Sequence, residues 1–246
     1  MSRAVFIVTS YITNKNQHQL LLDCVNSIKI HNPDAAIQIL DDDHSKPDYA
    51  SIPDFCKIEK TKHARCGEVN AYVWAIDHKL EYDIFIYIHD SCKVRGEIPY
   101  QLKGRHFRQF WFTSRYSNHN TTGDEIDSLM EQFTISRKHC KQELELVRGG
   151  KENIIFGAMA AFDQDFLTFL ETQTNFVSLV HVLNKRSMRC FFERLLYIIV
   201  VNFTGGREFV SNAYCGDIFK HANAFNNKDN NIKPNNPYLV KVWQSR

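Results

Sequence analysis

The chain has 246 residues, enough to bury the core of one large domain or two small ones. Its 43% hydrophobic and 13% aromatic residues exclude a disordered protein, which would need low hydrophobicity or a strong charge imbalance. Thirty Lys and Arg residues against 28 Asp and Glu residues give a formal charge of +2, so net charge does not indicate a nucleic-acid or membrane partner.

The first 90 residues alternate between predicted strands and predicted helices. Runs of β-branched and aromatic residues predict strands at residues 5–8, 36–40, 56–60 and 83–88. Apolar residues at helical spacing predict helices at residues 17–30 and 68–80, the first of them ending at His31-Asn32-Pro33. This alternation is typical of an α/β fold with an open, mostly parallel sheet. Ligands of such sheets bind outside the carboxyl ends of the strands.

The pattern changes after residue 95, and the remaining elements alternate less regularly. A strand is predicted at residues 105–115, and a strand or turn rich in small residues at 154–162. Helices are predicted at residues 123–133, 163–172 and 185–201. We expect the Asn-rich residues 223–237 to form a surface excursion and residues 238–243 to dock back onto the domain.

Acidic residues follow two of the predicted parallel strands. Asp41, Asp42 and Asp43 come after the second strand, and Asp90 comes directly after the last one. Because parallel strands end at the same edge of a sheet, we expect both groups to meet in one crevice. A carboxylate after an early strand can accept hydrogen bonds from a ribose or a base, and a deeper one can bind a divalent cation. The alternative for each group is an ordinary acidic turn.

Four segments together resemble the GT-A type of glycosyltransferase, in a small viral or bacterial form. They are residues 5–11, the Asp41-Asp42-Asp43 run, Gly67-Glu68-Val69-Asn70 and Tyr87-Ile88-His89-Asp90-Ser91. Members of that group usually carry an Asp-x-Asp motif after the fourth strand, whereas His89-Asp90-Ser91 keeps one acid. The resemblance implies a GT-A-like, Rossmann-like sheet flanked by helices in a single domain. Residues 1–95 would form its nucleotide-binding half and residues 96–246 its acceptor-side half.

The resemblance also implies how the donor is bound. Binding of the donor nucleotide is assigned to Thr9, Tyr11, Asp41, Asp42, Asp43, His63, Gly67, Asp90 and Gly157. His63 and Gly67 come just before a predicted helix, whose amino terminus can hold phosphate, and Gly157 lies in a small-residue loop that would support the donor sugar. Asp90 and a late histidine, His221, would bind Mn²⁺ or Mg²⁺. The aromatic residues of the predicted strand at 105–115 would line the acceptor side.

Glu193 is the candidate catalytic base. It stands alone in an apolar stretch, so its carboxylate must be paired or have a raised pKa, and either suits proton abstraction from an acceptor hydroxyl. A structural ion pair with Arg189 or Arg194 is the alternative. A single base opposite the leaving group favours an inverting displacement.

The sequence therefore predicts an enzyme that moves a sugar from a nucleoside-diphosphate sugar, which we expect to be a UDP-sugar, to a hydroxyl of a glycan or protein. Two rival functions remain open. One is a nucleotidyltransferase, although no Gly-rich phosphate loop follows Val8. The other is a non-catalytic nucleotide- or carbohydrate-binding module.

Cysteine spacing and hydropathy indicate in which cellular compartment the protein is expected. The seven cysteines form no CxxC pair, which favours free thiols in a reducing environment. We recognise no signal peptide at the amino terminus, and the apolar run at 195–203 is too short for a bilayer. We therefore expect a cytoplasmic protein, in the host cytoplasm if the chain is viral, with no transmembrane segment and no nucleic-acid partner.

Overall fold

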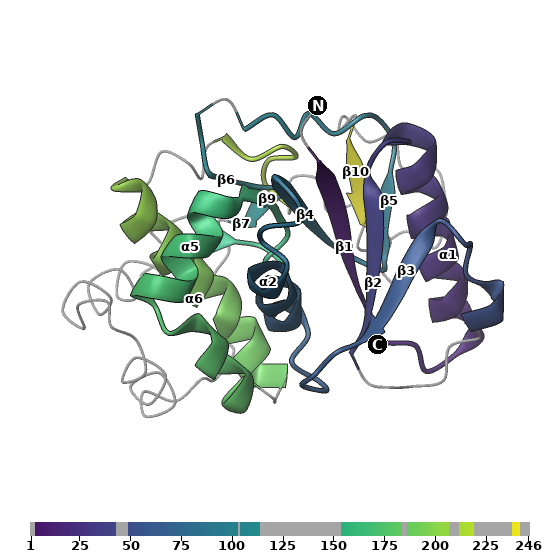
Figure 1. Cartoon of the computed structure of the whole chain (residues 1–246), viewed down its shortest axis with the longest axis horizontal. Helices are drawn as coiled ribbons and strands as arrows, with labels where there is room; N and C mark the ends of the chain where they lie inside the picture. Colours follow the sequence, from purple (N-terminus) through teal and green to yellow (C-terminus); the bar gives the residue numbers. More distant parts are fainter. Residues whose placement is uncertain are drawn as a thin grey trace.

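A six-stranded sheet is the centre of the protein (Figure 1). The structure, a computed structural model, describes residues 3–42, 49–102, 104–113, 154–183, 186–206, 212–218 and 238–241, without the side chains of 186–190. The strand order is β3-β2-β1-β4-β9-β6. The strands are β1 (Ala4–Ser10), β2 (Ala36–Asp41), β3 (Cys56–Lys60), β4 (Ile84–His89), β6 (Phe107–Gln109) and β9 (Ala160–Asp163). Strands β1 to β4 run parallel and β9 runs antiparallel to both neighbours, so the predicted mostly parallel α/β sheet is confirmed.

Strand β1 lies between β2 and β4, and its pairing sets where the strands end. Residues Val5 to Val8 are fully buried, as a β-branched and aromatic strand covered on both faces should be. At its end, Ser10 pairs with Asp41 of β2 and Thr9 pairs with His89 of β4. The carboxyl ends of β1, β2 and β4 therefore lie side by side at one edge of the sheet.

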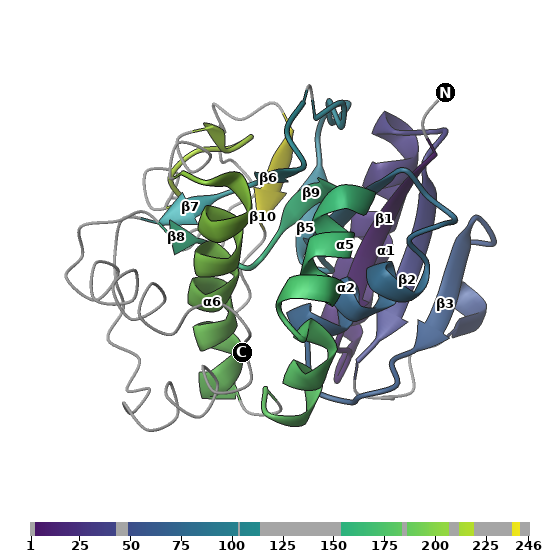
Figure 2. The same ribbon diagram turned by 60° about the vertical axis from the view of Figure 1, so that its left-hand side comes forward.

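Helices cover both faces of the sheet. Helix α1 (Lys15–His31) lies on one face, and α2 (Glu68–Asp77) and α5 (Gln164–Gln173) lie on the other (Figures 1 and 2). The side chain of Asn14 accepts a hydrogen bond from the Gln17 N–H at 3.0 Å and caps the start of α1. Both helices predicted in the first half are thus present.

The second half of the chain adds a helix and two small sheets. Helix α6 (Arg186–Thr204) packs against β8 (Ile154–Ile155), which pairs with β7 (Phe112–Thr113). Short 3₁₀ helices occur at η1 (Tyr49–Ser51) and η2 (Phe176–His181).

An aromatic stack joins the two halves of the chain. The ring centroid of Phe162 in β9 lies 4.7 Å from that of Tyr72 in α2 and 5.9 Å from that of Phe85 in β4. Because Phe162 is fully buried between residues of the first half, the two halves share one core. The predicted division near residue 95 stays a prediction.

Residues 105–113 differ from the single strand predicted there. They form β6 and β7, because β6 pairs with β9 in the large sheet whereas β7 pairs with β8 in a separate one. Phe107, Phe110 and Trp111 are 2%, 0% and 2% exposed. The expectation that these rings line an acceptor surface is therefore wrong, because they pack in the core.

The last described strand returns to the site edge. Strand β10 (Leu239–Lys241) pairs antiparallel with β5 (Cys92–Val94), which confirms that the chain docks back after residue 238. The predicted helix at 123–133 and the excursion at 223–237 lie outside the described residues.

Two expectations about compartment can be compared with the structure. The described cysteines with side chains are free thiols, namely Cys24, Cys56, Cys66, Cys92 and Cys215. Among the helices that the structure describes, none combines the length and the apolar character needed to cross a bilayer.

Candidate functional site

The two predicted acidic groups converge at the carboxyl edge of the sheet. The backbone N–H of Asp42 donates to the Ser10 carbonyl at 2.9 Å, and that of Asp90 donates to the Thr9 carbonyl at 3.4 Å. Both acids therefore flank the end of β1. Asp43 lies outside the described residues, so its position stays a prediction.

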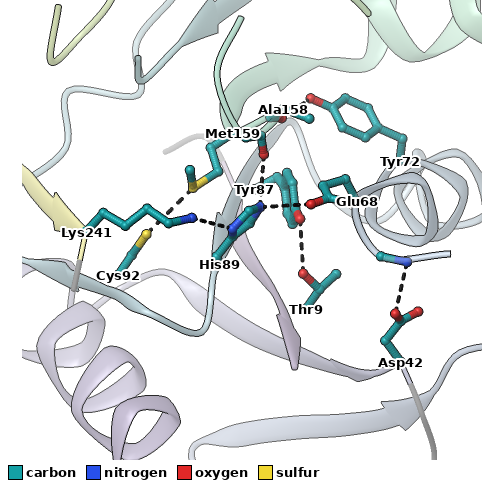
Figure 3. A network of polar contacts seen from close by, with 12 residues as sticks. Thr9, Asp42, Glu68, Tyr72, Tyr87, His89, Cys92, Ala158, Met159 and Lys241 are labelled. Carbon is teal, nitrogen blue, oxygen red and sulfur yellow. Dashed lines mark hydrogen bonds and ion pairs between the residues drawn. The ribbon is translucent and has the colours of Figure 1, made fainter. Parts of the chain in front are cut away.

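Asp42 organises the start of helix α2. Its Oδ2 accepts from the Gly67 N–H at 2.9 Å (Figure 3). Its Oδ1 accepts from Asn70 Nδ2 at 2.6 Å. A carboxylate at a helix amino terminus is also favoured by the helix dipole. Because the Gly67 N–H donates to Asp42 in this structure, the phosphate role expected of Gly67 stays a prediction.

Asp41 and Tyr49 form a second contact at this edge. Asp41 is buried, and the Tyr49 hydroxyl donates to its Oδ2. Partial burial and this carboxylate raise the pKa of Tyr49 to about 12. Tyr49 is still 37% exposed, which leaves its ring accessible beside the end of β2. Sequence reasoning missed it.

The other residues assigned to the nucleoside lie at the end of β1. Thr9 shares a hydrogen bond of 3.0 Å with the hydroxyl of Tyr87, and the Tyr11 N–H donates to Asp90 Oδ2 at 3.4 Å. Asp90 thereby holds the loop that leaves β1. The structure brings Thr9, Tyr11 and Asp90 together, as the sequence predicted.

His63 lies in the loop between β3 and α2. Its ring meets that of His181 edge to face, with centroids 5.6 Å apart. Burial, followed by the charges of His181 and Lys62, lowers the pKa of His63. His63 also lines a small pocket together with Asn70 and Trp74. His63 therefore lies next to the Asp42 contacts, and its role in donor binding stays a prediction.

His89 is the centre of a polar network (Figure 3). Its Nε2 lies 2.9 Å from the carbonyl oxygen of Gly157, and its Nδ1 lies 2.7 Å from Lys241 Nζ. A carbonyl can only accept, so Nε2 carries a hydrogen, and the ammonium donates to Nδ1. We therefore assign a neutral imidazole, the Nε2–H tautomer. Glu68 Oε1 lies 3.5 Å from the same Nε2.

Gly157 is required by both backbone conformation and space. Its φ of +67° is disfavoured for other residues, and a Cβ there would lie 2.6 Å from Met159 Cε and 3.5 Å from His89 Cε1. The adjacent Ala158 carbonyl accepts from the buried Tyr72 hydroxyl at 2.6 Å. The loop is therefore fixed from two sides. Its support of a donor sugar stays a prediction.

Glu193 and Glu68 bring two carboxylates to this loop. Burial, followed by the charge of Glu68, raises the pKa of Glu193 to about 7, while the Gly157 N–H, Arg194 and Lys241 oppose the rise. The sequence left two alternatives for Glu193, a paired carboxylate or a raised pKa, and these surroundings favour the raised pKa. Its role as the catalytic base stays a prediction. Glu68 Oε2 is buried and has no hydrogen-bond partner within the described part of the chain. From the sequence, Glu68 was noted only as part of the Gly67-Glu68-Val69-Asn70 segment and was assigned no role.

The side chains beside the end of β4 do not by themselves fit a divalent cation. Mg²⁺ and Mn²⁺ take several oxygen ligands, whereas Asp90 is 3% exposed and already accepts from Tyr11. Both ring nitrogens of His89 are occupied, and the Lys241 ammonium beside it would repel a cation. His221 lies outside the described residues, so a metal held by Asp90 and His221 stays a prediction.

Another group of side chains, one histidine and two aspartates, could hold a metal, but it lies away from Asp90. His106, Asp163 and Asp165 have ligand atoms within 4.8 Å of one another. Asp163 pairs with Ile84, the first residue of β4, so the cluster lies at the opposite edge of the sheet. Asp163 Oδ1 accepts from the Asp165 and Phe166 N–H groups, which caps helix α5. Helix capping accounts for Asp163 without a metal.

The sheet and its edge define an α/β protein with a Rossmann-like centre. No protein-family model matches the chain, and a search of curated proteins finds no match. Solved structures similar to this chain include a mannosyltransferase and a core-mannan synthase.

Three of these structures illustrate the similarity. The mannosyltransferase Ktr4p from S. cerevisiae is 8% identical with a TM-score of 0.45, over 78% of this chain and 62% of that one. S. aureus TarS 1-349 is 11% identical with a TM-score of 0.43, over 81% and 56%. Core-mannan synthase A from Aspergillus fumigatus, in a Mn/GDP form, is 10% identical with a TM-score of 0.43, over 79% and 67%. The chain thus spans about 60% of the length of the first two structures.

Proposed function

We propose that the chain is a glycosyltransferase that moves a sugar from a nucleoside-diphosphate sugar, a UDP-sugar in particular, to a hydroxyl of a glycan or protein. The observation that carries the proposal is Glu193, whose pKa of about 7 suits a general base near neutral pH. The Gly157 N–H lowers the pKa of Glu193, and the Gly157 carbonyl accepts from His89 at the end of β4. A candidate base and the acidic edge therefore belong to one network.

The nucleoside occupies the end of β1 in this proposal. Asp41 and Asp43 accept hydrogen bonds from the ribose or the base, with Thr9 and Tyr11 beside them. The partly exposed ring of Tyr49, held by its bond to Asp41, adds a face on which the base can stack. Asp42 does not contact the nucleoside in this proposal; it fixes the start of α2 by accepting from the Gly67 N–H.

The proposed reaction is a single displacement. Glu193 in its ionised form takes the proton from the acceptor hydroxyl, and the acceptor oxygen forms a bond to the anomeric carbon. The bond between that carbon and the phosphate oxygen breaks, and the nucleoside diphosphate leaves with the electron pair. Because one base acts opposite the leaving group, the anomeric configuration inverts.

Incubation with a panel of nucleotide sugars, with Mn²⁺ and with EDTA, tests this function. We expect hydrolysis of one donor by the wild type and its loss in Glu193→Gln, with donor binding retained. Glu97→Gln is the matched control, because Glu97 is exposed and lies outside the network. Pyrophosphate exchange would instead indicate a nucleotidyltransferase. Binding without turnover would indicate a binding module.

A further inference from the structure

Lys241 is a buried cation that forms no ion pair with any of the described residues. The residue is 8% exposed, and no carboxylate oxygen of the described residues lies within 4.0 Å of its Nζ. Its hydrogen bond within this part of the structure goes to His89 Nδ1, at 2.7 Å. An ammonium has three donors, so two of them have no hydrogen-bond acceptor among the described residues. Burying an uncompensated charge is costly, which indicates that an anion completes this environment.

The neighbouring histidine does not neutralise this charge. His89 donates from Nε2 to the Gly157 carbonyl and accepts at Nδ1 from Lys241, so the ring is neutral. Glu68 lies on the far side of the ring, 3.5 Å from Nε2. The charge of Lys241 lowers the pKa of Glu193, but the two side chains do not form an ion pair.

Lys241 lies where the ligands of parallel sheets bind, and this position indicates that its anion belongs to such a ligand. Lys241 pairs with Cys92, which follows the His89-Asp90-Ser91 turn at the end of β4. Its side chain points from β10 toward His89 (Figure 3). The ammonium therefore lies at the sheet edge where β1 and β4 end, and where ligands of parallel sheets bind.

We propose that Lys241 binds the diphosphate of the donor nucleotide and supplies the positive charge that a divalent cation was expected to supply beside Asp90. This inference rests on the proposed glycosyltransferase function. As the bond from the anomeric carbon to the phosphate oxygen breaks, negative charge grows on the departing diphosphate, and a fixed ammonium stabilises it. His89 positions the ammonium by accepting one of its hydrogen bonds.

Calorimetric titration in EDTA tests the proposal with uridine, UDP and inorganic pyrophosphate as probes. The wild type should bind UDP more tightly than uridine, and Lys241→Met should weaken UDP binding about 10- to 100-fold while leaving uridine unchanged. Lys241→Arg should keep most of the preference for UDP. Lys93→Met is the matched control, since Lys93 is exposed on the adjacent strand β5, and it should bind like the wild type.

Several results would overturn the role of Lys241. UDP binding by Lys241→Met at wild-type strength would do so, and so would a preference of the wild type for UDP that appears only with Mn²⁺. If Lys241→Met does not fold, a preference for UDP in EDTA that stays constant as salt is raised counts against a charge-based site.

The pyrophosphate arm separates this inference from the proposed function. If the wild type binds neither uridine nor UDP, the proposed function fails. Pyrophosphate binding that depends on Lys241 would then still support an anion site. If pyrophosphate does not bind, or binds equally well to Lys241→Met, the anion site at Lys241 is overturned as well.

Discussion

The carboxylate of Glu68, at the start of α2, raises the pKa of Glu193 in α6. Two nearby carboxylates resist simultaneous ionisation, and burial of Glu193 adds to the effect. The Gly157 N–H, Arg194 and Lys241 favour the ionised form and limit the rise. The basicity of Glu193 is therefore set by residues from distant parts of the chain.

Activity should depend on the ionised form of Glu193. We expect kcat/KM of the wild type to rise with pH and to level off above about 7, the pKa of this group. Glu193→Gln should lower kcat about 10²- to 10⁴-fold and leave the affinity for UDP unchanged, because the base acts on the acceptor. Steady-state kinetics between pH 5 and 9 measure both. A Gln variant with an intact rate would exclude Glu193 as the base.

Replacing Glu68 by Gln should shift this pH profile. The change removes a negative charge while keeping the size of the side chain, so the pKa of Glu193 falls and the acidic limb moves to lower pH. The shift should be partial, because burial is the largest cause of the raised pKa. Glu171→Gln, on the exposed side of α5, serves as the control. An unchanged midpoint in Glu68→Gln would show that the two carboxylates do not interact.

The stability of the fold should also depend on the protonation of Glu193. Its pKa is about 7 when folded against a reference value of 4.5, so the folded state binds an extra proton between these values. The stabilisation that protonated Glu193 adds to the free energy of unfolding is full below about pH 4.5. It is lost as pH rises through 7, a change on the order of 3 kcal/mol. Glu193→Gln should therefore gain stability relative to the wild type between pH 5 and pH 8. Urea unfolding of both proteins at the two pH values measures the difference, and an equal difference at both would contradict the prediction.

Gly157 should tolerate alanine less well than another glycine of the same backbone conformation. Gly157→Ala adds a Cβ at 2.6 Å from Met159 Cε, whereas Gly205, at φ +70°, has nothing within 4 Å of such a Cβ. Gly205→Ala should cost roughly 1 kcal/mol from backbone strain alone, and Gly157→Ala should cost more. The free energy of unfolding in urea compares them. Equal losses would mean that Met159 moves away freely.

The parallel half of the fold could be predicted because its signals are local. Strands β1, β2 and β4 are largely buried runs rich in apolar residues, and helix α1 has a clear end at Asn32. Residues 105–113 were harder, because their split into two strands depends on pairing with β9 and β8, which come about 50 residues later. Pairing at such separation leaves no periodic signal in the sequence.

The same difference explains which site residues could be found. Asp42 and Asp90 were identified because they follow two parallel strands that end at the same edge of the sheet. Glu193 was identified because an acid inside an apolar helix is unusual. Lys241 and Tyr49 are ordinary surface-type residues in the sequence. Their meaning comes from contacts with His89 and Asp41 that only the folded chain creates.

The pairing of β10 with β5 brings together two residues that are synthesised at different times, Lys241 and His89. Lys241 and His89 are 152 residues apart, so a ribosome adding 5–20 residues per second needs roughly 8–30 s to make the stretch between them. The four parallel strands β1 to β4 all precede that stretch in the sequence. Lys241 can therefore reach His89 only after all four parallel strands have been synthesised, so the ammonium joins this edge of the sheet later than the acids that surround it.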